Sequence, residues 1–519
     1  MKLNVKRTVC VGFAFFLICT FWQAYDTIIP KILTDRFGMS QSVSGFIMAL
    51  DNILALFMLP LFGVLSDKCR SKLGRRTPFI LFGTIAAVVA LTGLSLISGA
   101  QLSKIGDIGS REAQYMIYDV KKDADLVTPG GEKFRLSDKF TRDEFAAIES
   151  IDAETGKATD DYTNYVVPAR QSYVKTEITA KNTGILVGFI AILLVLLMAM
   201  ATFRTPAVAL MPDVTPKPLR SKANAIINLM GTIGGSLVLG LGIVLKTGKT
   251  ANTFMSYTGY FCIVGGIMLV CLCAFMLTVK EPRLVKKMED ESREFGIDES
   301  ENDLDAKHEA GAGKLSRGEM TSLVLILASV VFWFFGYNAV TSKYSVYAGN
   351  VLNLDYNSTL LVANIAALIS YIPVGAVASK IGRKRTIQCG IVLLAVCFSL
   401  GYVLTTTFTS INAIMFIVFA LVGLAWAAIN VNSLPMVVEM CKGSDIGKFT
   451  GYYYTASMAA QVVTPVVAGT LMRKIDYRVL FPYAALFVAL SFVTMLFVRH
   501  GDVKAEAKKG LDAFEDMDD

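Results

Sequence analysis

Four ionisable side chains stand inside long apolar runs of this sequence. Asp26 lies in FWQAYDTIIPK and Asp51 in IMALDNILALF, while Arg204 lies in MATFRTPAVAL and Lys343 in YNAVTSKYSVY. A charge at the centre of a bilayer costs about 2.5–3.5 kcal/mol on insertion scales, so such residues mark paths for protons, ions or solutes if the runs cross a membrane. A carboxyl group in an apolar setting can exchange a proton near neutral pH, and a nearby arginine shifts that exchange.

Asp26 is the first candidate for a proton carrier, with Arg204 as its switching partner and Asp51 as a second carboxylate. The histidines, His308 and His500, fall outside the apolar runs, so carboxylates would have to carry any proton. Two alternatives stay open for the first pair. It could be a permanent structural pair, or the arginine could hold hydroxyl groups of a solute with its donor fork.

Amide and aromatic side chains near the middle of the same runs are candidates for holding a sugar. Amides bond to hydroxyl groups, and aromatic rings cover the apolar face of a sugar ring. Each of these side chains is equally suited to a contact between helices. The candidates are Trp22, Gln23, Tyr25, Asn52, Asn228, Asn338, Lys343, Asn364, Tyr371, Trp426, Asn430 and Gln461.

The elements that position these residues are predicted to be membrane-spanning helices. Hydrophobic residues make up 54% of the chain and charged residues 18%, and the mean hydropathy is +0.52. Runs long enough to cross about 30 Å of hydrocarbon, roughly 20 residues as helix, recur along the chain. The net charge of +7 therefore belongs to the loops of a protein embedded in a lipid bilayer, not to a nucleic-acid-binding surface.

Hydropathy predicts twelve spans, so the expected fold is an all-α membrane bundle of two six-helix halves. The first six spans lie near 8–31, 41–65, 78–100, 183–211, 221–246 and 256–279. The second six lie near 320–347, 357–378, 386–407, 411–438, 448–472 and 480–499. Basic loops at 66–76, 217–222 and 380–385 fall on one side of an alternating count. That side is expected to be the cytoplasm and to carry both termini.

Two polar stretches interrupt the spans. Residues 101–181 form an extracytoplasmic insertion in which YMIYDV, EKFRLSD and TNYVVPARQSYVKTEI alternate as strands do, and TPGGEK indicates a turn. A small folded domain and a partly ordered loop both fit this pattern. The expected division is 1–279 for the first bundle with its insertion, 280–319 for a cytoplasmic connector, 320–500 for the second bundle and 501–519 for a cytoplasmic tail.

The basic loop after span two is repeated after span eight. GVLSDKCRSKLGRRT begins at Gly63 and GAVASKIGRKRT begins at Gly375, one six-span set later. Parallel six-span repeats are typical of two-bundle secondary transporters. The first loop resembles the signature of the major facilitator superfamily. Its long spacing, together with PAVALMPDV at the end of span four, resembles the sucrose:proton symporters of plants and animals and, more distantly, the glycoside–pentoside–hexuronide:cation symporters.

The resemblance implies a cytoplasmic gate in the first half. Gly63 and Gly74 would allow close helix packing and a sharp turn. Asp67 would face the start of span eleven, near Lys448. Alternatively, the basic loop has no gating role and only fixes the orientation of the spans in the membrane. The residues expected to pair across the end of the spans are Arg75 and Arg76 with Asp213.

The second copy of the loop implies a weaker latch. Arg383 or Lys384 would meet Glu439, but Ser379 stands where the first copy has its aspartate. These pairs would close the cytoplasmic end and break when that end opens. The sequence also departs from the plant sucrose carriers, because Val208 stands where they have an arginine and Arg204 lies one turn away.

The resemblance and the residues together imply a proton-coupled symporter of a di- or oligosaccharide glycoside, monomeric and multi-pass in the plasma or inner membrane. A drug or organic-ion exporter of the same superfamily is one alternative. A membrane sensor that receives a ligand at its insertion is another. Sodium coupling is less favoured, because the paired carboxylates of melibiose-type carriers are missing. The sequence contains no P-loop, catalytic triad or metal-ligand cluster, so neither an enzyme, a cofactor nor a metal is expected.

Overall fold

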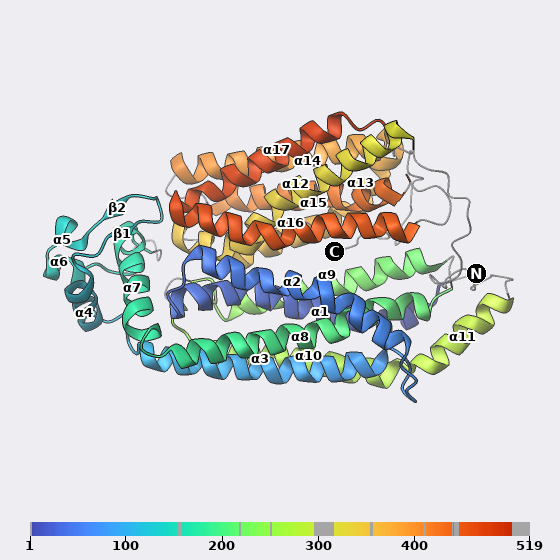
Figure 1. Ribbon diagram of the computed structural model, residues 1–519, viewed down its shortest axis with the longest axis horizontal. Helices are drawn as coiled ribbons and strands as arrows, with labels where there is room; N and C mark the ends of the chain where they lie inside the picture. Colours follow the sequence, from blue (N-terminus) through green and yellow to red (C-terminus); the bar gives the residue numbers. More distant parts are fainter. Residues whose placement is uncertain are drawn as a thin grey trace.

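The computed structural model describes residues 3–152, 158–216, 219–249, 252–294, 316–352, 356–407, 412–438, 440 and 446–500. Two groups of six long helices pack one above the other (Figure 1). The first half contains α1 (Val5–Lys31), α2 (Gln41–Asp67), α3 (Thr77–Ile105), α8 (Thr183–Asp213), α9 (Arg220–Val244) and α10 (Thr258–Thr278). The second half contains α12 (Arg317–Tyr347), α13 (Tyr356–Ile381), α14 (Arg383–Thr407), α15 (Asn412–Val438), α16 (Ile446–Lys474) and α17 (Leu480–Leu496).

These helices confirm the all-α membrane bundle. Within the described residues, 11 helices are long and apolar enough to span a membrane, and α13 completes the second set at the position that α2 holds in the first. Each half has its own buried apolar core. Large apolar side chains such as Phe57, Phe82 and Leu277 are exposed on the outer faces, where lipid would cover them.

Local sequence explains where several of these helices begin and turn. The Ser316 side chain accepts from the backbone N–H of Glu319, whose carboxylate accepts in return from the Ser316 backbone N–H, and this capping box starts α12. At the start of α2, the Ser40 hydroxyl accepts from the backbone N–H of Val43. Helix α1 does not stop at Lys31, because a π-helical turn, Ile32–Arg36, continues it and carries three further polar residues into the protein.

The insertion between α3 and α8 is a small folded unit at one end of the bundle (Figure 1). It contains α4 (Arg111–Lys121), a hairpin of β1 (Leu126–Val127) and β2 (Lys133–Phe134), α5 (Leu136–Lys139), α6 (Arg142–Ala146) and α7 (Val167–Tyr173). Two π-helical segments, Tyr162–Val166 and Val174–Thr179, flank α7. Its own core includes Ile117, Leu136, Phe145, Val166 and Val174.

The strands predicted for most of this insertion are wrong. YMIYDV lies in α4, where Ala113, Ile117 and Lys121 are buried at intervals of four residues and so share one helical face. The segment TNYVVPARQSYVKTEI is helical throughout. The turn at TPGGEK is confirmed: it joins β1 to β2, with Gly131 at a φ of +82° that favours glycine. The strand predicted in EKFRLSD is confirmed only for the two residues of β2, Lys133–Phe134.

The end of the bundle opposite the insertion carries the basic loops, and we call it the basic end. Helix α11 (Glu281–Glu294) leaves the first half there (Figure 1). This short helix lies within the expected connector and is amphipathic, with Met288 and Ser292 buried one turn apart. The rest of the expected connector, 295–315, and the tail from 501 lie outside the described residues.

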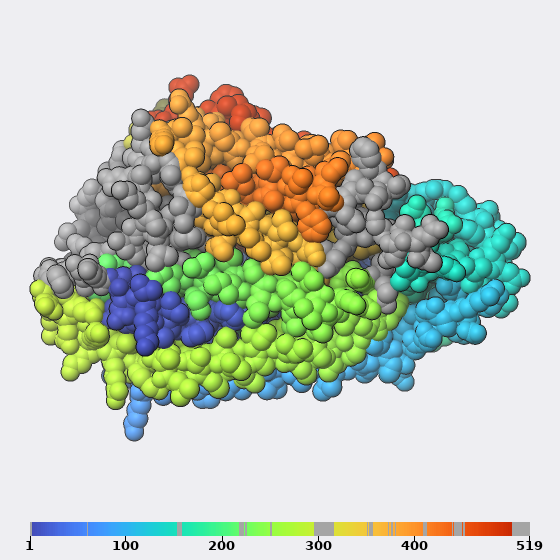
Figure 2. All heavy atoms as spheres, turned by 180° about the vertical axis from the view of Figure 1, so that it is seen from behind, coloured from blue at the N-terminus to red at the C-terminus, as the bar shows by residue number. Residues whose placement is uncertain are grey.

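The two halves touch most closely at the insertion end. A Cβ atom added to Gly45 of α2 would collide with the carbonyl oxygen of Pro465 in α16, and one added to Gly469 would collide with that of Gln41. The Lys343 ammonium of α12 donates to the Gln41 carbonyl over 3.0 Å. On the opposite side of the molecule, the surface of α9 lies against that of α13 (Figure 2).

The insertion takes part in the same closure. The backbone N–H of Tyr477 in the second half donates to the Pro129 carbonyl of the hairpin turn over 2.7 Å. Asn357 of α13 donates to the Thr247 hydroxyl over 3.0 Å, and that hydroxyl also meets the hydroxyl of Tyr356. In the described part of the chain, the hydrogen bonds between the two halves lie at the insertion end. The exception is the 3.5 Å bond between Asn364 and Gln23 near the middle of the bundle.

We expect Gly45→Ala to destabilise the closed contact between α2 and α16. An added methyl group forces two helix backbones apart, and such overpacking costs about 1–3 kcal/mol. Thermal melting of the detergent-solubilised protein should show a clear fall. Gly240→Ala in α9 is the control, since its new Cβ meets nothing within 4 Å and alanine is the better helix former. Equal melting of the two variants would contradict the close contact.

Candidate functional site

A cavity of about 300 Å³ lies between the two halves near the middle of the bundle. Helices α1, α8 and α9 form one wall and α13 and α15 the other. Such a volume lies at the lower end of the range for small-molecule sites. The lining residues are Phe15, Ile18, Cys19, Trp22, Gln23, Asp26, Arg204, Val208, Asn228, Gly231, Thr232, Gly235, Asn364, Tyr371 and Asn430.

Helix α1 supplies the polar core of this wall. Cys19, Trp22, Gln23 and Asp26 follow one another at helical spacing, so they share the face that looks into the cavity. A close approach of α9 holds that face in place. A Cβ atom at Gly234 would lie 2.7 Å from the carbonyl oxygen of Phe16, which leaves room there for glycine alone.

The predicted charged residues come together at the cavity. Asp26 and Arg204 both line it, and the Arg204 guanidinium lies 5.7 Å from the centre of the Trp22 ring, in the range of a cation–π contact. Asp51 of α2 lies close enough for its charge to act on both Asp26 and Arg204. Its carboxylate accepts from the side-chain amide of Asn52 over 2.9 Å. One guanidinium and two carboxylates therefore share a single electrostatic neighbourhood.

Two buried polar atoms of the cavity residues have no partner among the described residues. They are the indole N–H of Trp22, a donor, and the side-chain oxygen of Asn430, an acceptor. Across the cavity, the Asn364 amide of the second half donates to the Gln23 side-chain oxygen of the first over 3.5 Å. Buried groups of this kind are usually satisfied, so both point to a ligand or to water with donors and acceptors of its own.

Six of the twelve predicted sugar-binding side chains line the cavity: Trp22, Gln23, Asn228, Asn364, Tyr371 and Asn430. Tyr25 faces the core of the first half instead, stacked on Phe21 at 5.9 Å. Asn52 bonds to its neighbour Asp51, as described above.

The remaining candidates belong to the second half and are not among the residues that line the cavity. Trp426 stacks on Tyr337 with ring centres 3.7 Å apart, inside the apolar core. Lys343 serves the contact at the insertion end. Asn338 and Gln461 are not among the lining residues.

Sequence reasoning missed the apolar part of the lining, which includes Phe15, Ile18 and Val208. Phe15 could have been predicted, because it shares one helical face of α1 with Cys19, Trp22 and Asp26. Val208 needed the structure, because only packing shows which face of α8 looks inward.

At the basic end, the predicted arginine cluster is present within the first half. Arg76 is buried, and its Nε donates to the Asp213 carboxylate over 2.9 Å. Its other nitrogens contact Asp67 and the Ser66 hydroxyl. Arg75 reaches Asp213 over 3.5 Å from a half-exposed position.

An acid that the sequence reasoning missed completes this cluster. The Glu281 carboxylate, 1% exposed, accepts from the backbone N–H groups of Arg75, Arg76 and Thr77, at distances from 2.7 to 3.1 Å. These groups form the amino-terminal end of α3, where a negative charge is favoured. Gly74, at a φ of +115°, lets the loop pass against this carboxylate, and Gly63 packs close to Thr205.

The cluster differs from the expected latch in one respect. Its partners all belong to the first half, so these ion pairs tie helices of one half together and do not themselves bridge the halves. In the second copy, Lys384 donates to the carbonyl oxygens of Leu496 and Val498 at the end of α17, and Arg383 is buried. Their expected partner Glu439 lies outside the described residues, as does the side chain of Lys448.

Known proteins share this fold and parts of this sequence. The sucrose transport protein SUC3 of Arabidopsis thaliana is 45% identical over 60 residues, which are 11% of this chain and 10% of that protein. The human proton-associated sugar transporter A is 35% identical over 88 residues, 17% of this chain and 11% of its own. These matches span only a small part of the relatives' length. The inward-open xylose transporter XylE from E. coli matches 99% of both chains with a TM-score of 0.58 at 16% identity, which shows the shared fold.

Family models cover most of the chain. The model described as MFS/sugar transport protein matches residues 10–101. The model of the Major Facilitator Superfamily matches residues 178–371 and 360–515. With the twelve-helix, two-half architecture and the repeated basic loop, these matches establish that the chain belongs to the Major Facilitator Superfamily of membrane transporters.

Proposed function

We propose that this protein is a secondary active transporter that carries a sugar together with protons by alternating access. The observation that carries the proposal is the central cavity. Both halves contribute to its lining, which includes the charged residues Asp26 and Arg204 and aromatic rings. The indole N–H of Trp22 and the side-chain oxygen of Asn430 have no hydrogen-bond partner among the described residues. A sugar hydroxyl both donates and accepts, so sugars suit such a lining.

The size and charge of the cavity favour a short sugar. About 300 Å³ favours a mono- or disaccharide over a long oligosaccharide. The names of the relatives, a sucrose transport protein and a proton-associated sugar transporter, support the same cargo class. Arg204 at the cavity argues against an exporter of lipophilic cations, because a guanidinium in the cavity wall repels a cation.

The closed insertion end supports the alternating-access part of the proposal. A cavity between two halves that touch tightly at one end opens to the other side when the halves rock. We infer that the basic end faces the cytoplasm, from the density of Lys and Arg in its short loops, and that the insertion lies outside the cell membrane. The first-half cluster around Arg76 would then keep that half rigid as it moves.

Coupling is assigned to Asp26, Asp51 and Arg204. When Asp26 is protonated it is neutral, so the loaded cavity can pass from one side of the membrane to the other at little electrostatic cost, whereas the free carboxylate makes that change costly. The two carboxylates sit on different helices, α1 and α2. Rocking of the halves changes how far water reaches the cavity that Asp26 lines, so it changes the affinity of this carboxylate for the proton.

We expect Asp26→Asn to abolish sugar accumulation driven by a pH gradient while exchange of sugar across the membrane persists. The amide keeps the shape of the side chain and removes its titration. Proteoliposomes loaded with labelled sugar, with and without a pH gradient, measure both activities. Asp107→Asn, at an exposed site in the insertion, is the control and should accumulate sugar normally. An Asn variant that concentrates sugar as well as the parent protein would exclude Asp26 as the coupling residue.

We expect Trp22→Phe to weaken sugar binding by about 2- to 10-fold. The variant keeps an aromatic ring and removes the free indole N–H, and one hydrogen bond is worth about 0.5–1.5 kcal/mol. Equilibrium binding of a sugar panel measures the loss. The matched control is Trp426→Phe, because that indole stacks on Tyr337 and is not among the residues that line the cavity. If both variants bind sugar alike, the cavity is not the sugar site.

We expect Asp213→Asn to lower thermal stability by about 1–3 kcal/mol, because it leaves the buried guanidinium of Arg76 without its main partner. Arg75→Gln is the matched comparison within the same cluster. Its half-exposed pair at 3.5 Å should be worth at most about 1 kcal/mol. Melting of the purified variants separates the two, and a larger effect at Arg75 would contradict the geometry described here.

A further inference from the structure

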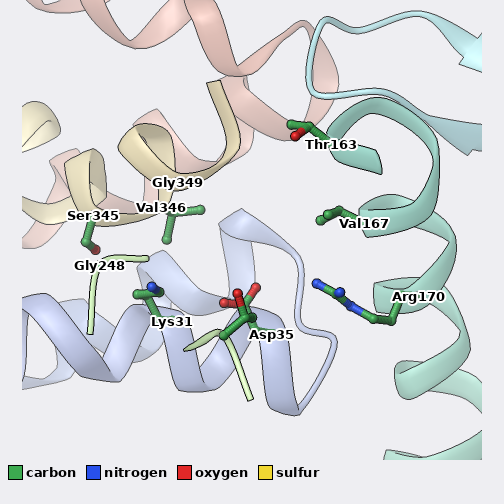
Figure 3. Close-up of a pocket in the computed structure, with 10 residues that line it drawn as sticks. Lys31, Asp35, Thr163, Val167, Arg170, Gly248, Ser345, Val346 and Gly349 are labelled. Carbon is green, nitrogen blue, oxygen red and sulfur yellow. The ribbon is translucent and has the colours of Figure 1, made fainter. Parts of the chain in front are cut away.

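A second, much smaller cavity lies at the insertion end, where three parts of the chain meet (Figure 3). Lys31 and Asp35 reach it from α1 and its π-helical continuation, and Arg170 reaches it from α7 of the insertion. Ser345 closes it from α12 of the second half. In Figure 3, the Arg170 guanidinium extends toward Asp35, and Lys31 lies on the other side of that carboxylate.

Positive charge is in excess around this cavity. The side chains of Lys31 and Arg170 are buried, with exposed fractions of 6% and 2%. Two more buried cations lie close by in the sequence: Arg36, next to Asp35, and Lys343, two residues before Ser345. Among the described residues that line the cavity, Asp35 is the only acid.

The polar contacts of these cations are mainly to neutral groups. Lys31 donates to the Thr247 carbonyl over 3.0 Å, and Arg170 contacts the Tyr162 hydroxyl and lies over the Phe254 ring at 4.6 Å. Arg36 donates to the Ser98 hydroxyl and the Met255 carbonyl. In the part of the chain that the structure describes, neither Lys31 nor Arg170 is within ion-pair distance of Asp35. Buried charge that is not neutralised is costly, so the excess calls for a counter-ion.

Two donors are also left over at the cavity. The Nε–H of Arg170 and the Ser345 hydroxyl are buried and have no hydrogen-bond partner within the described residues. They come from opposite sides of the boundary between the insertion and the second half. A guanidinium N–H and a hydroxyl are common ligands of anions.

We propose that this cavity binds a compact inorganic anion of the size of chloride. Its volume of about 30 Å³ has room for little more than a water-sized group, for which about 10–15 Å³ is enough, so a sugar does not fit. Because the lining comes from the first half, the insertion and the second half, the site is complete only when this end is closed. A bound anion therefore stabilises the closed insertion end, whatever the central cavity carries.

Thermal melting of the full-length protein in detergent tests the site without transport. Sodium chloride is titrated into sodium gluconate at constant ionic strength, because gluconate is too large for the cavity. The melting temperature should rise by several degrees and saturate with chloride, as linkage requires for an ion that binds the folded state. Sodium bromide should act in the same way, and its anomalous signal in crystals should lie between Arg170 and Ser345.

Two variants and a control identify the site. Arg170→Gln removes the positive charge. Ser345→Ala removes only a hydroxyl group, so the Ser345 variant still tests the site if the Arg170 variant does not fold. Each should lose most of the chloride-dependent rise. Arg142→Gln is the control: it removes an arginine of the insertion that pairs with Asp119 on the surface, and its chloride response should be unchanged. Equal melting in chloride and gluconate, or a normal chloride response in Ser345→Ala, would show that the cavity holds water and would overturn the proposal.

Discussion

The contact between α2 and α16 at the insertion end determines much of the rest of the structure. Gly45 and Gly469 let the two backbones approach until carbonyl groups take the space of side chains. A closure of this kind holds the two halves together at one end, so only a very small cavity remains there and the larger space lies farther along the bundle. The central cavity lies in that space, with Gln23 and Asn364 facing each other across it.

The burial of charge follows a consistent physical rule. At the basic end, Arg76 and Glu281 are buried, but the carboxylates of Asp213 and Asp67 and the end of α3 neutralise them within one half. At the insertion end, the buried cations outnumber the buried acid and lie where different parts of the chain meet. The first arrangement makes a rigid unit. At the insertion end, the electrostatic energy of the buried cations depends on how the first half, the insertion and the second half are placed relative to one another. A conformational change at this end therefore changes that energy.

The insertion shows where sequence patterns mislead. YMIYDV alternates over six residues and suggests a strand, but a window that short cannot separate alternation from one face of a helix. Longer context decides, because the buried positions of α4 repeat every four residues. The turn at Thr128–Gly131 was predictable, since glycine at a positive φ is a local requirement. The docking of that turn on Tyr477 was not, because it joins segments far apart in the chain.

By itself, the sequence determined the membrane-spanning helices, the two six-helix sets and the ionisable residues within the spans, which are costly to place in a bilayer. Those features follow from composition, periodicity and the cost of transferring charge, which act along a helix and need no neighbour. Tertiary structure alone decided that Trp22 faces the cavity and Trp426 does not, that Glu281 holds the start of α3, and that Lys31, Asp35 and Arg170 meet. The physical reason is that packing between helices sets which face of a helix points inward and which distant charge lies opposite it. Local sequence patterns do not contain that information.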